Sequence, residues 1–244
     1  MILPGLLLLI GGGEWLVRGA SRLASLLGVP PVVIGLSVVA FGTSAPELAV
    51  SILSAYRGQP DIAVGNVVGS NIVNILLILG LSAVVAPLAV SMRLIKIEVP
   101  MMIGTALLFF ALAYDGKLTR LDGALLVGIF AAYLAWMART ARSETLLEAE
   151  LEESGAIPHN GWTYLKLVVL VVAGLAGLVV GSEWLIQGAV AAARALGVSE
   201  LVIGLTVVAI GTSLPELATS VIASLRGERD ISVGNVVGSN IFNI

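Results

Sequence analysis

Long apolar runs, separated by short stretches that contain charged residues or Pro and Gly, form the hydrophobic pattern of this chain. Val99–Tyr114 and Gly123–Met137, for example, contain no charged residue. A run of about 20 apolar residues is long enough for a helix to cross the roughly 30 Å hydrocarbon core of a bilayer. The pattern therefore predicts an all-α, polytopic membrane protein.

The polar breaks divide the chain into eight candidate membrane spans. Their expected bounds are about 2–22, 30–55, 64–89, 95–114, 120–138, 163–192, 199–224 and 232 onward. Composition agrees with this interpretation, because 58% of the residues are hydrophobic and only 12% are charged, whereas soluble domains average about 25% charged residues. Cysteine is absent from the sequence, which excludes disulfides and thiolate chemistry within it.

Basic residues between the spans predict the orientation of the chain, because Lys and Arg concentrate in cytoplasmic loops. If the N-terminus lies outside, the cytoplasmic loops contain eight such residues and the external loops contain four. The cytoplasmic residues are Arg18, Arg22, Arg93, Lys96, Arg139, Arg142, Arg226 and Arg229, and the external ones are Arg57, Lys117, Arg120 and Arg194. We therefore expect an integral protein of the cell membrane with an external N-terminus.

One hydrophilic segment, residues 139–162, follows the fifth span and contains a cluster of Glu residues. Its length and composition favour a solvated cytoplasmic linker over a folded domain. A regulatory Ca²⁺ site of the EF-hand type is disfavoured, because the segment lacks the alternating Asp or Asn ligands and the central Gly of that loop. The expected organisation is a first repeat over 1–138, this linker, and a second repeat over 163–244.

An internal repeat relates the two parts of the chain. Gly35–Ile75 aligns without gaps on Gly204–Ile244 at a constant offset of 169, and 28 of the 41 aligned residues are identical. Five candidate spans separate equivalent points, and this odd number means that the second copy enters the membrane in the opposite direction. Inverted repeats with a substrate site between them, near the bilayer midplane, are an architecture of transporters.

The repeated segments keep polar residues inside apolar spans. Ala40–Glu47 reads AFGTSAPE, and Ala209–Glu216 reads AIGTSLPE. Helical spacing places the Thr and Ser of each motif on the same face as the Glu, and the Pro removes a backbone hydrogen bond and bends the helix. Hydroxyls, freed carbonyls and one carboxylate per copy are hard oxygen ligands, which suit Na⁺ and Ca²⁺.

A second repeated motif follows in the next span of each copy. Gly65–Asn74 reads GNVVGSNIVN, and Gly234–Asn243 reads GNVVGSNIFN. The Ser and the last Asn are four residues apart, so that each pair faces one direction, and the two Gly residues permit close helix contact. Four helices, two from each copy, are therefore expected to converge around one centre.

Glu47 and Glu216 carry the functional prediction, because a charged side chain at the centre of a membrane costs at least about 2.5–3.5 kcal/mol. Neither motif contains Lys or Arg, whereas one Ca²⁺ or two Na⁺ would neutralise both carboxylates. Packing is the alternative role for the motif glycines, and the Thr-Ser hydroxyls can instead bond to the preceding helical turn. Glu14 and Glu183 are weaker candidates. Glu14 can pair with Arg18 four residues further on, whereas Glu183 faces Gln187 and has no such partner, and structural pairing or a position at the level of the lipid headgroups is the alternative to a functional role.

On these residues the sequence resembles the cation/Ca²⁺ antiporter superfamily, and in particular the prokaryotic Na⁺/Ca²⁺ exchangers. The motif Gly-Thr-Ser-x-Pro-Glu, present twice and followed each time by Gly-Asn-x-x-Gly-Ser-Asn, is similar to the paired repeats of that family. The resemblance implies ten helices in two inverted halves of five, with alternating access driven by sliding of the first and sixth helices. The last two helices and most of the eighth would then lie beyond Ile244, so that these residues alone are not expected to transport.

The resemblance also implies which residues bind the ions. The implied ligands are Thr43, Ser44, Glu47, Ser70 and Asn74 and their counterparts Thr212, Ser213, Glu216, Ser239 and Asn243, with the backbone carbonyls of Ala40 and Ala209 contributing to Na⁺ sites. One departure concerns Asn243, because some archaeal exchangers carry Asp at that position. With one fewer carboxylate, the ion stoichiometry stays open.

The predicted function is Na⁺-driven Ca²⁺ antiport without a cofactor, by a monomer that is embedded in the lipid bilayer and binds no nucleic acid. Exchange of Ca²⁺ for H⁺, or exchange that also requires K⁺, on the same fold is the main alternative, and a passive cation channel is a weaker one. An enzyme is disfavoured, because the sequence offers neither a nucleophile–base pair nor a metal-binding set of His and Cys residues.

Overall fold

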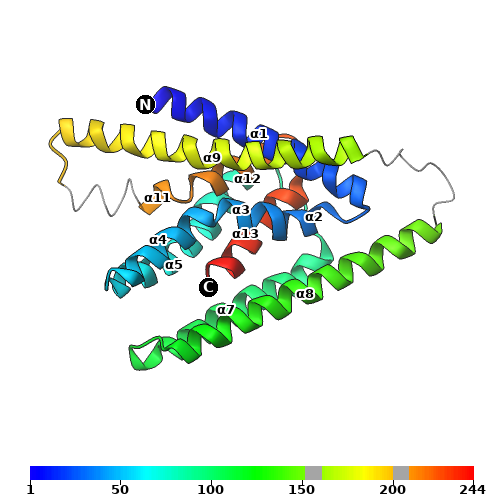
Figure 1. The fold of residues 1–244 in the computed structure, drawn as a ribbon, viewed down its shortest axis with the longest axis horizontal. Coiled ribbons are helices and arrows are strands. Elements are labelled where there is room, and N and C mark those ends of the chain that lie inside the picture. The colour runs from blue at the N-terminus through cyan, green and yellow to red at the C-terminus, as the bar shows by residue number, and fades with distance from the viewer. Residues whose placement is uncertain (152–160, 200–208) are drawn as a thin grey trace.

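The computed structural model describes residues 1–151, 161–199 and 209–244, and every regular element in these ranges is helical. The elements are α1 (Ile2–Leu27), α2 (Pro31–Ile34), η1 (Gly35–Val39), α3 (Ala40–Thr43), α4 (Ala45–Tyr56), α5 (Pro60–Ile72), η2 (Val73–Ile78), α6 (Leu79–Val85), η3 (Leu94–Glu98), α7 (Val99–Leu112), η4 (Ala113–Asp115), α8 (Arg120–Leu151), α9 (Gly161–Ala195), α11 (Ala209–Gly211), α12 (Leu214–Leu225) and α13 (Arg229–Asn243). The predicted all-α fold is confirmed (Figure 1).

The described helices have the lengths and surfaces of membrane spans. Five are long and apolar enough to cross a bilayer, and the bent pair Pro31–Thr43 and Ala45–Tyr56 makes a sixth. Large apolar side chains face outward, since Val84 of α6 and Leu107 of α7 are 83% and 64% exposed. A contiguous apolar exterior suits lipid and not water, so that the protein is an integral membrane protein.

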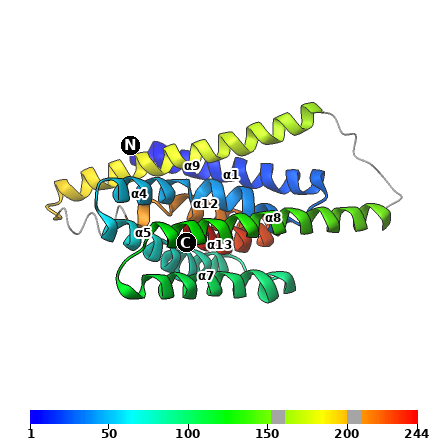
Figure 2. The same cartoon turned by 60° about the horizontal axis from the view of Figure 1, so that its bottom comes forward.

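α1 and α9 lie side by side along most of their lengths and run in opposite directions (Figures 1 and 2). Glycines recur at the contact, and a Cβ atom added to Gly12 would lie 2.7 Å from the backbone nitrogen of Leu178 and 2.8 Å from the carbonyl oxygen of Gly174. Gly5 meets the carbonyl of Gly181 in the same way. The two backbones therefore touch directly, which only small residues permit.

α13 crosses the centre of the structure (Figure 2). It packs against α2, η1, α3 and α12, and every residue from Ile231 to Ile241 is buried. An apolar cluster joins α13 to α8 through Tyr133 and Met137. Because α13 carries the second Gly-Asn motif, this packing places the motif inside the protein.

Part of the predicted linker is helical. α8 extends to Leu151, although the fifth span was predicted to end near residue 138. Only Arg120–Thr140 is apolar enough to cross the membrane, and the Glu, Ala and Leu residues that follow are strong helix formers, which explains the extension. Residues 152–160 of the linker, and residues 200–208 of the predicted seventh span, lie outside the described residues.

Candidate ion-binding site

Both copies break their helix at the Ser of the Gly-Thr-Ser-x-Pro-Glu motif. Ser44 has φ −82° and ψ 4°, and Ser213 has φ −88° and ψ 9°. The next helix begins directly after each Ser, with the Pro in its first turn, where a missing N–H has no cost. In the first copy the two helical segments meet at 45°, which confirms the predicted bend.

The helix breaks bring the two copies into contact through their Ser and Glu side chains. The hydroxyl of Ser44 donates to Oε1 of Glu216 over 2.7 Å, and the hydroxyl of Ser213 donates to Oε1 of Glu47 over 3.1 Å. Glu47 is 2% exposed and Glu216 is fully buried. The carboxylates thus meet in one buried centre, as predicted, and each is held by the other copy.

Several oxygen atoms of the predicted ligands have no hydrogen-bond partner among the described residues. These buried atoms are Oε2 of Glu47, Oε2 of Glu216, Oδ1 of Asn74, Oδ1 of Asn243 and Oγ of Ser239. Buried polar atoms in native proteins are normally satisfied, and carboxylate and amide oxygens cannot donate to one another. The Ser239 hydroxyl is near enough to act on the Glu216 carboxylate, and a hard cation is a partner that every one of these oxygens can accept.

The remaining predicted ligands are buried and bonded within the protein. Thr43 donates to the carbonyl of Ala40 over 3.3 Å and to Oδ1 of Asn235 over 3.1 Å. Nδ2 of Asn243 donates to the hydroxyl of Ser70 over 3.1 Å, which joins α13 to α5. Thr212 is 9% exposed and lies beside the Ser213 contact, whereas the side chain of Ala209 lies outside the described residues.

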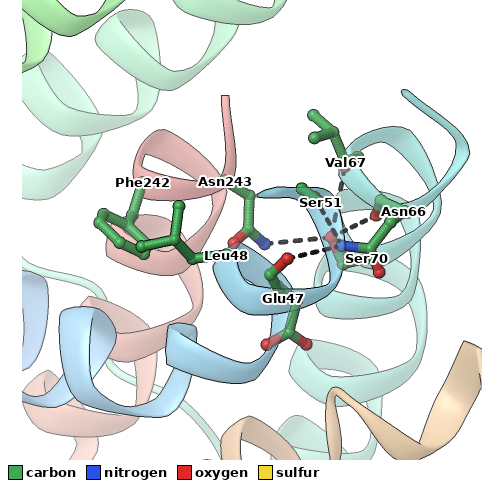
Figure 3. Close-up of a pocket in the computed structure, with 8 residues that line it drawn as sticks. All are labelled: Glu47, Leu48, Ser51, Asn66, Val67, Ser70, Phe242 and Asn243. Atoms are coloured by element: carbon green, nitrogen blue, oxygen red, sulfur yellow. Dashed lines mark hydrogen bonds between the residues drawn. The ribbon is translucent and has the colours of Figure 1, made fainter. Parts of the chain in front are cut away.

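A small cavity of about 50 Å³ opens beside Glu47, and Figure 3 shows the residues around it. The lining residues are Glu47, Leu48, Ser51, Asn66, Val67, Ser70, Phe242 and Asn243. The Glu47 carboxylate points away from the hydrogen bonds of Asn66 and Ser70, and the Asn243 amide points toward them (Figure 3). The cavity therefore lies between α4, α5 and the end of α13, next to predicted ligands of both copies.

Two Asn residues that the sequence interpretation left without a role hold the backbone at the carboxylates. Asn66 donates from Nδ2 to the carbonyl of Glu47 over 3.0 Å, and Asn235 donates in the same way to the carbonyl of Glu216 over 3.4 Å. Each also bonds, over 2.9 Å, to the hydroxyl of the Ser four residues after the Glu. The repeat could have indicated this role, because both copies have Asn at the same position.

The charge of the centre comes from the two carboxylates alone. Neither Glu47 nor Glu216 takes part in the ion pairs of the described residues, and the two carboxylates act on each other electrostatically. Nowhere in the described ranges do three His, Cys, Asp or Glu side chains gather as a metal cluster. The candidate site is thus a doubly acidic centre surrounded by neutral hydroxyl and amide oxygens.

Acidic residues outside this centre have partners of their own. Glu14 pairs with Arg18 over 2.6 Å, and Gln187 donates to Glu183 over 3.2 Å, as helical spacing predicts. Glu14 also pairs with Arg226 in the turn between α12 and α13, which the sequence did not indicate. These contacts explain Glu14 and Glu183 without placing them at the centre.

Glu98 is a buried carboxylate that the sequence interpretation missed. It is the last residue of η3, directly before α7, and is fully buried. It accepts a 2.7 Å hydrogen bond from the Tyr133 hydroxyl of α8, and it lies 3.7 Å from Nε of Arg93. A carboxylate with an aromatic hydroxyl and a guanidinium beside it is paired within the membrane. We assign it to the docking of α7 on α8.

A helical membrane protein whose buried centre combines two carboxylates with hydroxyl and amide oxygens belongs to the class expected of a cation transporter. Residues 1–139 and 166–244 match the family model described as sodium/calcium exchanger protein. The chain belongs to this family, and the predicted membership of the cation/Ca²⁺ antiporter superfamily is confirmed.

Relatives and solved structures support the same assignment. The chain is 46% identical to the putative antiporter CaxA of Alkalimonas amylolytica, over 100% of this chain and 76% of that protein. It is 34% identical to the sodium/calcium exchanger MaX1 of Methanosarcina acetivorans, over 100% and 79%. A solved structure of a sodium/calcium exchanger from Methanococcus jannaschii superposes with a TM-score of 0.85 at 37% identity, covering 100% of this chain and 76% of that chain. The protein is therefore a transmembrane antiporter and not an enzyme.

Proposed function

We propose that this protein exchanges Na⁺ for Ca²⁺ and binds the two ions in turn at the centre between α4, α5, α12 and α13. The observation that carries the proposal is the reciprocal contact of Ser44 with Glu216 and of Ser213 with Glu47. Each contact uses one carboxylate oxygen and leaves the other without a partner among the described residues. Two such oxygens in one buried centre form an acidic pair for cations.

Charge balance supports competition between the two ions. Two buried carboxylates without a basic partner are unfavourable in a membrane, and either one Ca²⁺ or two Na⁺ would neutralise both. Because the same oxygens would bind either one Ca²⁺ or two Na⁺, binding of one kind of ion excludes the other. Exclusion of this kind couples the outward movement of one ion to the inward movement of the other.

The proposed ligands are the residues predicted from the repeated motifs, and the hydrogen bonds suggest how they would bind. The Ala40 carbonyl, a proposed Na⁺ ligand, accepts bonds from the Thr43 hydroxyl and from the Ser44 backbone nitrogen over 3.0 Å. Binding of Na⁺ there would turn the Thr43 hydroxyl from the carbonyl toward the ion. The amide oxygen of Asn243 takes the place of a carboxylate, which leaves the stoichiometry to experiment.

We further propose that α1 and α9 move together when the centre changes the membrane face to which it opens. Their glycine contact brings backbone against backbone at Gly12 and Gly174, so that sliding within the pair would break many close contacts at once. Sliding of the pair over α12 and η1, which it also contacts, disturbs fewer of them. The proposed motion is thus a unit of two helices passing a fixed ion centre.

The test is uptake of radioactive Ca²⁺ into proteoliposomes that contain the full-length natural protein, under separately imposed Na⁺, K⁺ and H⁺ gradients. An outward Na⁺ gradient is expected to drive uptake, and Glu47→Gln is expected to reduce it at least tenfold. Glu183→Gln is the matched control, because Glu183 is exposed and accepts its hydrogen bond from Gln187 of the same helix, away from the carboxylate centre. Ca²⁺ uptake that ignores the Na⁺ gradient would contradict the proposal.

The same experiment separates the alternatives. Uptake driven by a pH gradient without Na⁺ would indicate H⁺/Ca²⁺ exchange, with the glutamates carrying protons. A requirement for K⁺ together with Na⁺ would indicate K⁺-dependent exchange. Flux of Ca²⁺ down its own gradient, with no counter-ion on the other side, would indicate a channel. The shared centre of the two repeats, with ligands from both copies, favours a carrier over a channel.

A further inference from the structure

Hydroxyl groups line the interface between α12 and α13 on one side of Glu216. The Ser224 hydroxyl donates to the Ser232 hydroxyl over 2.9 Å, and the Ser232 hydroxyl lies 2.9 Å from the carbonyl of Ser220. The Ser220 hydroxyl accepts a 2.9 Å bond from Asn235, whose Nδ2 also contacts the carbonyl of Glu216. We call Ser220, Ser224 and Ser232 the hydroxyl row. All three are at most 2% exposed.

The first copy lacks most of this row. At the positions equivalent to Ser224 and Ser232 the first copy has Ala55 and Ala63, and only Ser220 has a hydroxyl counterpart, Ser51. The repeats are otherwise identical at 28 of 41 positions. Small residues are sufficient to let two membrane helices approach, and Ala meets that need in the first copy. The first copy carries a different buried Ser on α4, Ser54, where the second copy has Ala223, so that the position of the hydroxyls, and not their presence, distinguishes the second copy.

A further buried hydroxyl lies close to Glu216 on α12. Thr219 is fully buried, and its Oγ1 has no hydrogen-bond partner within the described part of the chain. It lies three residues after Glu216 and so near that side chain on the helix, but about 100° round α12 from Ser220, so that it borders the carboxylate and not the hydroxyl row. The equivalent residue of the first copy is Val50. A buried hydroxyl without a partner costs about 1–3 kcal/mol, which a passing ion or water would relieve.

A polar cavity lies beyond the end of the hydroxyl row. Ser224 lies eight residues after Glu216, which corresponds to about 12 Å along a helix. Beyond it, Glu228 accepts a hydrogen bond from Ser21 of α1 over 2.5 Å. A cavity of about 230 Å³ lies there, lined by Val17, Arg18, Ser21, Arg22, Arg226 and Glu228. The row thus runs along α12 from the carboxylate centre toward the α12–α13 turn.

We propose, building on the function proposed above, that the hydroxyl row is the path by which the transported cation travels between Glu216 and the α12–α13 turn. A hydroxyl oxygen can replace a water ligand of Na⁺ or Ca²⁺, and a Ser side chain needs only to rotate to exchange a hydrogen bond for the ion. In the described conformation the hydroxyls bond to one another and to α12, which keeps the path closed. Contact of α1 with the turn, through Ser21 and Glu228, closes its end.

The first test replaces the row with the residues of the other copy. The double substitution Ser224→Ala and Ser232→Ala is expected to raise the half-saturating Ca²⁺ concentration at the face of the α12–α13 turn at least fivefold, and to leave that of the opposite face unchanged. Na⁺-dependent uptake is measured in proteoliposomes of both orientations. An equal change of the half-saturating Ca²⁺ concentration at both membrane faces, or no change at either face, would contradict the proposed ion path.

A second test reports accessibility directly. In a background without cysteine, as these 244 residues already are, Ser224→Cys is expected to react with a membrane-impermeant cationic thiol reagent added at the turn face, and saturating Ca²⁺ is expected to slow the reaction. Ser182→Cys is the control, because Ser182 is a buried Ser of α9 whose hydroxyl bonds only within its own helix. Equal reactivity of Ser224→Cys and Ser182→Cys, or no reaction of Ser224→Cys, would contradict the proposed ion path.

The two proposals fail separately. If the unsubstituted protein shows no Na⁺-dependent Ca²⁺ uptake, the proposed function is wrong. If it exchanges the ions but the double substitution lowers only the unfolding temperature, the hydroxyl row is helix packing and the exchange function stands.

Discussion

Ser44 donates a 2.7 Å hydrogen bond to Glu216, a residue 172 positions away in the other copy of the repeat. The reverse contact, from Ser213 to Glu47, is longer at 3.1 Å. Both Ser residues sit where a helix ends and the next begins, so that their side chains are fixed by the backbone break and not by a continuing helix. The centre is consequently shared: neither copy can form its half without the other.

Replacing Ser44 by Ala is therefore expected to weaken cation binding at the centre, because it removes a proposed ligand and the group that holds Glu216 in place. The loss of one such polar contact is worth about 1–1.5 kcal/mol, so that affinity for Ca²⁺ should fall about tenfold. Ser213→Ala, which removes the longer bond, should have the smaller effect. Equilibrium binding of radioactive Ca²⁺ to the purified protein measures both, with Ser182→Ala as a control. Equal affinity in Ser44→Ala and the parent would contradict a role for this contact.

The glycine contact between α1 and α9 gives a stability prediction with a neighbouring control. Gly12→Ala would place a Cβ atom 2.7 Å from the backbone of Leu178, so that the helices must separate. Overpacking of this kind typically costs about 1–3 kcal/mol, and we expect a lower unfolding temperature in detergent. At Gly11 an added Cβ meets nothing within 4 Å, so that Gly11→Ala should leave the temperature unchanged or raise it. The same shift in both variants would argue against the backbone contact.

Asn235 should matter more than its counterpart Asn66. Asn235 is fully buried and bonds to Thr43 in addition to the two contacts that both Asn residues make, whereas Asn66 is only half-buried. Asn235→Ala should lower Ca²⁺ affinity several-fold more than Asn66→Ala, because it also releases Thr43. Equal losses in the two alanine variants would speak against the link through Thr43.

The buried Glu98 predicts a purely structural effect. Tyr133→Phe removes the hydroxyl that donates to Glu98 over 2.7 Å and leaves the carboxylate with one fewer partner. Loss of such a bond costs about 1–3 kcal/mol, and the unfolding temperature should fall while Ca²⁺ affinity stays the same. Tyr114→Phe serves as control, because Tyr114 is 82% exposed. A change of affinity in Tyr133→Phe without a change in stability would connect this cluster to the ion centre.

Much of the fold and of the site follows from the sequence because its causes are local. Apolar run lengths indicate the spans, since a bilayer has a fixed thickness. The Pro in each motif predicts the break that the backbone of Ser44 and Ser213 shows. Helical spacing predicts Thr43, Ser44 and Glu47 on one face, but the break interrupts that face, and the Ser44 hydroxyl contacts Glu216 of the other copy instead. The extent of α8 beyond residue 138 was missed, because an acidic, helix-forming segment has no apolar pattern to mark it.

Contacts between distant helices were decided by tertiary structure alone. Spacing along one helix tells which side chains share a face, but it does not tell which helix of the other copy that face meets. The pairing of Ser44 with Glu216, the bond from Asn235 to Thr43 and the burial of Glu98 against Tyr133 depend on how the helices pack. The sequence by itself thus determined the membrane class, the repeat and the chemistry of the ligands. The packing determined which oxygens meet, because only it places the two copies against each other.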